Sequence, residues 1–294
     1  EAGAVAVSFT QPDGKAVKSK ADSKATAEAE ATGIGTDDGR ESEVLDTQLS
    51  IGPEGIDFTW HAEETASAET DTVANTGAII ASALTVSGAG GAAVSMDGAA
   101  KADATASSTS QAVAVDTGGG GDIIENDGYL ITTGNAISGA VAFSYGQKTD
   151  EKTKPKVAVD VGATSDSTAV GIRSDSGANT LTDITVDINS SGLLTTYLHE
   201  ETAVTGDDII TNRGRIDTLA TAKTGGLGVA VAIDGTAKAD VNATAKSKAT
   251  AIEGGGGDDL ITSSGDLTAT ANSDAVALAV GVGKMTDENS SAKT

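Results

Sequence analysis

The 294-residue chain contains no cysteine and only three prolines, and aromatic residues make up 2% of it. Without cysteine, disulfides and thiolate metal sites are excluded. Basic residues are also few: 43 acidic residues against 19 basic ones give a formal net charge of −24. Such an acidic surplus disfavours nucleic-acid binding, because the phosphates would be repelled. No run of about 18 apolar residues is present, so we expect no membrane insertion.

What the sequence does contain is self-similarity over a long period. The segment MDGAAKADATA at 96–106 returns as IDGTAKADVNA at 233–243. Three aspartates return at the same displacement as this segment: Asp38, Asp71 and Asp122 are matched by Asp175, Asp208 and Asp259. Within a block the step from the first aspartate to the second is short, and the steps that follow are longer. Repetition on this scale is typical of tandem arrays.

We therefore predict one repeat array over residues 1–294, as a segment of a longer protein. Residues 1–37 would be the end of a preceding turn that carries a protruding hairpin arm. Residues 38–174 would be the first block, and 175–294 a second, incomplete block. Strict alternation of polar and small apolar residues favours ordered β structure over the disorder that low aromatic content and high charge would otherwise fit.

Four of the six aspartates begin the pattern Asp-x-(Ile/Val)-x-(Asn/Ser)-x-Gly-x-(Ile/Leu), as in DIITNRGRI at 208–216. Its period of two predicts a short strand. If successive units stack, equivalent side chains form ladders. The apolar ladder would contain Val73, Ile124, Ile210 and Ile261, and the polar ladder Asn75, Asn126, Asn212 and Ser263.

Long stretches of alternating Ala or Ser precede the aspartates at 17–31, 100–114, 157–169 and 237–251. Two of them follow an Asp-Gly pair, at 97–98 and 234–235, which is a strong hairpin signal between alternating strands. We therefore interpret the longer steps as a plain turn of about 33 residues plus a hairpin, and the short steps as plain turns alone. The prediction is an all-β, parallel β-helix-like solenoid of about six turns with protruding Ala-rich β-hairpin arms.

Glycines cluster before some of the aspartates. The segment GGGGDDLIT at 254–262 matches the calcium-binding nonapeptide Gly-Gly-x-Gly-x-Asp-x-apolar-x, and 117–125 and 204–211 match it in part. Here the chain resembles the RTX (repeats-in-toxin) family. The resemblance implies calcium as a cofactor, with candidate metal ligands at Gly254, Gly256, Asp259, Gly119, Gly121, Asp122 and Asp208.

RTX nonapeptides follow one another directly, whereas each match here stands alone in the sequence. The alternative is that the glycines form a tight corner and the aspartate accepts hydrogen bonds from its backbone N–H groups. Both interpretations stay open at this point.

The Ile-x-Asn-x-Gly-x-Ile core, as in IITNRGRI at 209–216, resembles the repeats of β-helical bacterial surface proteins. These include autotransporter passengers and filamentous-haemagglutinin-like adhesins. The resemblance implies secretion by a bacterium and an extracellular or cell-surface location.

The leading functional hypothesis is a structural repeat protein that assembles into an extracellular filament, sheath or layer, with calcium as a candidate stabiliser. Its partner would be itself, through the Ala-rich arms and the solenoid surfaces. The alternative is an adhesin stalk or binding surface for a glycan, for which aromatics are scarce. A polysaccharide-active β-helical enzyme is the remote alternative. We expect no catalytic residues, because only two histidines, His61 and His199, are present and no nucleophile motif accompanies them.

Overall fold

The computed structural model describes residues 1–10, 18–36, 40–52, 55–67, 70–96, 98–148, 155–174, 178–189, 192–203, 206–284 and 291–293. Two of the repeating aspartates, Asp38 and Asp175, lie outside the described residues. Strands account for nearly all of this structure, and no helix occurs among the residues it describes. None of these residues therefore belongs to a helix long and apolar enough to cross a membrane.

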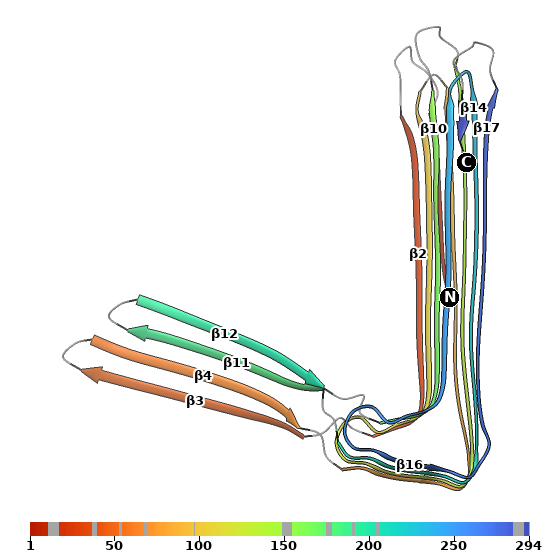
Figure 1. The fold of residues 1–294 in the computed structure, drawn as a ribbon. Coiled ribbons are helices and arrows are strands. Elements are labelled where there is room, and N and C mark those ends of the chain that lie inside the picture. The colour runs from red at the N-terminus through yellow and green to blue at the C-terminus, as the bar shows by residue number, and fades with distance from the viewer. Residues whose placement is uncertain are drawn as a thin grey trace.

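Three parallel sheets run through the molecule (Figure 1). The first, sheet A, has the order β1 (Ala2–Thr10), β6 (Ala78–Met96), β9 (Tyr129–Gln147), β14 (Arg215–Ile233) and β17 (Leu267–Lys284). The second, sheet B, has the order β18 (Ser291–Lys293), β15 (Thr236–Glu253), β10 (Lys156–Arg173), β7 (Ala100–Asp116) and β2 (Ser19–Gly35). The short sheet has the order β16 (Leu260–Ser263), β13 (Ile209–Asn212), β8 (Ile123–Asn126) and β5 (Thr72–Asn75).

The chain visits the three sheets in turn, which confirms the predicted all-β solenoid. One layer begins with a short strand such as β5, runs out along β6 in sheet A, turns at the tip and returns along β7 in sheet B. The next layer repeats this path through β8, β9 and β10, and each strand pairs in parallel register with its equivalent. Five such layers are stacked in each long sheet.

The Ala-faced segments form the walls of the solenoid, which corrects the prediction that they are hairpin arms. Their strands β7, β10 and β15 hydrogen-bond to one another along the stack, and each packs face to face on its sheet A partner. A hairpin would leave one Ala face of every strand in water and its outer edge unpaired. Folding the pair into an arch instead buries both Ala faces and pairs both edges of inner strands.

Small side chains let the two walls approach closely. Ala93, Ala104 and Ala142, between the walls, are at most 1% exposed. A Cβ added to Gly91 would lie 2.7 Å from the carbonyl oxygen of Asp103 in the opposite wall. Larger side chains would force such sheets to the usual spacing of about 10 Å.

The short steps, from Asp38 to Asp71 and from Asp175 to Asp208, are not plain turns, so that prediction is wrong as well. They contain the antiparallel hairpins β3 (Arg40–Gly52) with β4 (Gly55–Ser67), and β11 (Ala178–Asn189) with β12 (Gly192–Ala203). Although the two hairpins belong to different blocks of the sequence, they pair through β4 and β11 into one four-stranded sheet that projects beside the solenoid corner (Figure 1). The layers stack through equivalent strands of equal length, so the extra residues of these two steps lie outside the stack, where the two hairpins pair with each other.

Candidate functional site

The corner of the solenoid, around the short strands, is where the repeating motif places its polar residues. The predicted apolar ladder is confirmed there: Val73 pairs with Ile124, Ile124 with Ile210 and Ile210 with Ile261. Ile124 and Ile210 are at most 1% exposed. Together with Leu130 and Ile216 they form the apolar cluster on which the corner is built.

The predicted polar ladder is confirmed too. The Nδ2 atom of Asn75 donates to Oδ1 of Asn126 over 2.7 Å, and Nδ2 of Asn126 donates to Oδ1 of Asn212 over 2.7 Å. Asn212 continues the ladder to Oγ of Ser263 at 3.1 Å. Asn126 and Asn212 are at most 1% exposed, so these bonds satisfy amides that water cannot reach.

The repeating aspartates form a second column along the same corner. The backbone N–H groups of Asp71 and Asp122 donate to Oδ1 of the next aspartate, Asp122 and Asp208 respectively, each over 2.8 Å. Asp208 N–H donates to Oδ1 of Asp259 over 3.2 Å. The carboxylates of Asp122, Asp208 and Asp259 therefore each accept a hydrogen bond from the preceding layer, whereas the corner interpretation placed the donors in the aspartate's own turn.

Burial changes the acidity of this column. Asp122 is fully buried and Asp208 is 1% exposed. Burial raises the pKa of Asp122, because it disfavours the charged form, and the nearby Asp208 and Asp71 carboxylates act in the same direction. The neighbouring Thr117 side chain and the hydrogen bond from the Asp71 N–H lower the pKa of Asp122 but offset only part of this rise.

The glycines before Asp122 and Asp259 make the same turn in the two layers. Gly118 and Gly255 have φ of 78° and 83°, and Gly120 and Gly257 both have φ of 108°. These values lie where side chains other than hydrogen are strained, so the glycine runs have a conformational role.

Among the predicted calcium ligands, Gly254 and Asp259 are drawn together, since a Cβ on Gly254 would lie 2.6 Å from Oδ2 of Asp259. The carbonyl oxygen of Gly254 already accepts a hydrogen bond from Oγ of Ser174 at 2.8 Å. Gly119, Gly121 and Gly256 lie in the turns that precede Asp122 and Asp259.

The donor set fits calcium only in part. In the described part of the chain, no group of three or more His, Cys, Asp or Glu side chains could hold a metal ion. The aspartates stack in a column and do not converge on one point, and their Oδ1 atoms accept backbone hydrogen bonds. Oδ2 of Asp208 is buried and has no hydrogen-bond partner among the described residues. Because calcium takes six to eight oxygens, most would have to be carbonyls of the glycine turns.

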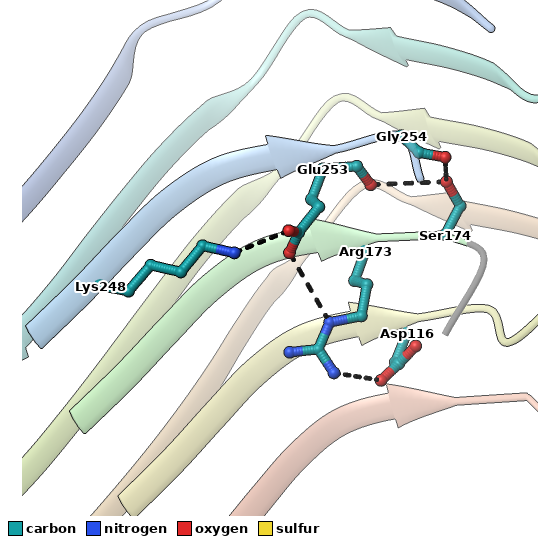
Figure 2. A network of polar contacts seen from close by, with 6 residues as sticks. All are labelled: Asp116, Arg173, Ser174, Lys248, Glu253 and Gly254. Atoms are coloured by element: carbon teal, nitrogen blue, oxygen red, sulfur yellow. Dashed lines mark hydrogen bonds and ion pairs between the residues drawn. The ribbon is translucent and has the colours of Figure 1, made fainter. Parts of the chain in front are cut away.

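A network of charges clamps three layers at the end of sheet B (Figure 2). Arg173 on β10 lies between two acids, with Nη1 at 3.4 Å from Oδ2 of Asp116 and Nε at 3.9 Å from Oε2 of Glu253. Lys248 reaches the other oxygen of Glu253 at 2.8 Å. Sequence reasoning missed this clamp. The signal was that Asp116 and Glu253 each precede a ladder aspartate, Asp122 and Asp259, at the same spacing.

A polar surface groove of about 650 Å³ crosses the corner beside the glycines that follow the Asn ladder. In it the Arg215 guanidinium lies over the Tyr129 ring, 5.4 Å from its centroid. Arg213 binds Oδ1 of Asp127 from the previous layer at 2.9 Å, and the Nε of Arg215 binds Oδ2 of Asp217 at 2.8 Å. The groove thus presents an aromatic ring and two arginines, which sequence reasoning also missed.

The two histidines weighed from the sequence lie in the projecting sheet, His61 on β4 and His199 on β12. In comparisons with known proteins, no family model, no curated protein and no solved structure matches the chain.

Proposed function

We propose that this chain is a structural repeat protein that assembles outside the cell into a filament, sheath or layer. The observation that carries the proposal is the use of the repeated motif: its Asn and Asp side chains bond to their own copies in adjacent layers. Because the recurring polar residues bond between layers, each added repeat extends the stack through the same contacts, as in other stacked repeats. The charge of −24 suits a soluble secreted polymer.

Calcium is the proposed stabiliser of the glycine corners. The buried, unpartnered Oδ2 of Asp208 supports this role, because it is a hard oxygen ligand that lacks a donor in the described residues. Binding to the folded form alone would raise the midpoint of thermal unfolding.

The test is electron microscopy and sedimentation of the purified protein at several concentrations, with calcium and with a chelator. We expect concentration-dependent ordered assemblies, and a lower unfolding temperature after chelation. Asp208→Asn should remove the calcium dependence, whereas the exposed Glu125→Gln should keep it. A protein that stays monomeric at all concentrations would contradict assembly, and an unfolding temperature unmoved by the chelator would contradict calcium.

A second candidate function is binding of an acidic glycan, as an adhesin would do. The groove with Tyr129, Arg213 and Arg215 favours it, because an aromatic face and guanidinium groups suit a sugar ring that carries a carboxylate. Calorimetry with oligosaccharides of uronic acids would test it. Binding is expected to be lost in Arg213→Gln and retained in Arg173→Gln, which changes an arginine outside the groove.

A further inference from the structure

The outer face of sheet A carries a flat apolar patch near the tip of the solenoid, here called the tip patch. The parallel register aligns its residues in three rows across five layers. The rows are Val5, Gly90, Val141, Leu227 and Leu278; Val7, Ala92, Phe143, Val229 and Val280; and Phe9, Val94, Tyr145, Val231 and Val282. None of these fifteen positions carries a charge.

The patch is exposed in the middle of the sheet as well as at its edges. On β9, which has two strands on either side, Val141 is 51% and Phe143 39% exposed. Their strand neighbours Ala140 and Ala142 point inward and are 1% exposed. Contiguous exposed apolar surface of this kind marks interaction sites, because single soluble domains seldom leave it uncovered.

A row of glycines borders the patch on the side away from the tip. Gly3, Gly88, Gly139 and Gly225 are aligned across four layers, and a Cβ added to any of them would meet nothing within 4 Å. By contrast, a Cβ on the inward-facing Gly134 would meet the Thr168 carbonyl oxygen at 2.6 Å. Glycine weakens a strand interior and often marks a bulge, a tight bend or the close approach of another backbone or ligand. The register is unbroken at these glycines, which leaves close approach. Packing within this chain does not explain the outward row.

The net negative charge of the chain limits which faces of two copies can meet. At −24, two copies repel each other wherever charged faces meet. The outer face of sheet B carries charges of both signs, with Lys101 beside Asp103 and Lys238 beside Asp240, so a contact there would bury charged groups. The tip patch lets two copies approach without burying a charge. We propose that it docks a second copy of this chain, patch against patch, with the glycine rows giving the closest backbone approach. This inference rests on the proposed assembly and names one of its contacts.

The size of the patch is sufficient for such a contact. With the bordering glycine row included, the contact surface has five strands about 4.8 Å apart and four rows about 6.8 Å apart, which cover roughly 650 Å². Two copies together would bury about 1,300 Å², within the range of about 1,200–2,000 Å² for specific interfaces. Association should strengthen with salt, because salt screens the repulsion between the acidic bodies.

The first test is analytical ultracentrifugation of the full chain in about 0.05 M and about 0.5 M sodium chloride, between which the Debye length falls from about 14 Å to about 4 Å. We expect Val141→Glu to weaken self-association at least about tenfold. The matched control is Thr109→Glu, which adds the same charge at an exposed position on β7 in sheet B. Equal weakening by both variants would show that charge alone acts and would overturn the proposal.

The absence of cysteine permits a second, geometric test. Val141→Cys should give a covalent dimer with a short bis-maleimide, and Thr109→Cys should not. The reverse pattern would place the contact on sheet B and reject the patch. If the wild type binds neutral lipid vesicles, Val141→Glu does not, and the wild type shows no self-association, the patch would be assigned to a membrane surface instead. If wild-type filaments form and Val141→Glu forms them equally well, the patch inference fails and the proposed function stands; if the wild type never assembles, both fail.

Discussion

For a single residue at the corner of this protein, the main contacts are hydrogen bonds to the equivalent residues in the neighbouring layers. Asn126 is the clearest case, because it accepts from Asn75 and donates to Asn212 at 2.7 Å each. Asn126→Ala removes both bonds, so one N–H of Asn75 and Oδ1 of Asn212 each lose their partner, while the other hydrogen bonds of the two amides remain. We expect it to destabilise the fold by about 2–4 kcal/mol, since each unsatisfied buried group costs about 1–3 kcal/mol.

Denaturant unfolding followed by circular dichroism would measure this loss. Glu125→Ala is the matched control, because Glu125 is the adjacent residue on β8 and points to solvent. Equal losses of stability in the two variants would mean that the ladder contributes nothing beyond the strand itself.

Asp122 makes a prediction about pH. Its folded pKa is raised above the ordinary value of 3.8, so protonation favours the folded state. This contribution is fully present below the unfolded pKa and is lost as pH rises through the folded pKa. Asp122→Asn keeps an oxygen for the Asp71 N–H and abolishes the titration. We expect the variant to gain stability relative to wild type as pH rises from 4 to 7, measured as the difference in unfolding free energy at each pH. A difference that does not vary with pH would contradict the burial of a charge at this position.

At the scale of the element, β9 shows how one strand serves two surfaces. Gly134 faces the opposite wall, where a Cβ would lie 2.6 Å from the Thr168 carbonyl oxygen, and Gly139 faces open space. Gly134→Ala should therefore cost about 1–3 kcal/mol through overpacking. Gly139→Ala should be neutral or stabilise by up to about 1 kcal/mol, because alanine restricts the unfolded chain. Thermal unfolding of the two variants compares the faces directly, and equal costs would show that the walls are further apart than the structure has them.

The wrong prediction of protruding hairpin arms also has its cause in the single strand. Alternation in 100–114 and 237–251 predicts strands, and both lie in observed strands, β7 and β15. Alternation cannot distinguish a hairpin from an arch, because both need two strands and a tight turn. Asp234, with φ of 58°, occupies the predicted Asp-Gly turn in the arch between β14 and β15. Which partner each strand bonds is decided by its copies in other layers, which lie outside any local window.

At the scale of the whole molecule, the projecting sheet is an insertion in a stack that is complete without it. The whole segment 175–207 lies between Ser174 and Asp208, whereas only four glycines separate the equivalent Thr117 and Asp122. We predict that replacing residues 175–207 by four glycines leaves the solenoid folded, since β13 can still stack on β8.

Far-ultraviolet circular dichroism and limited proteolysis would check this. The control is the same replacement applied to 123–155, a stretch that contains strands of the stack and whose removal should prevent folding. A chain that unfolds after loss of 175–207 would mean that the paired hairpins hold the layers together.

Period-two alternation and equal spacing are properties of the chain alone, and they were enough to predict the strands, the repeat and the ladders. The sequence predicted that Asn75, Asn126 and Asn212 share a ladder, and they do. The stacking of the layers had to be seen to learn which segments leave the stack, that Arg173 lies between two acids, and that Gly139 faces outward beside Val141 of the tip patch. The reason is physical: a side chain's environment here is set by residues 51 or 86 positions away, and those distances become neighbours only when the layers stack.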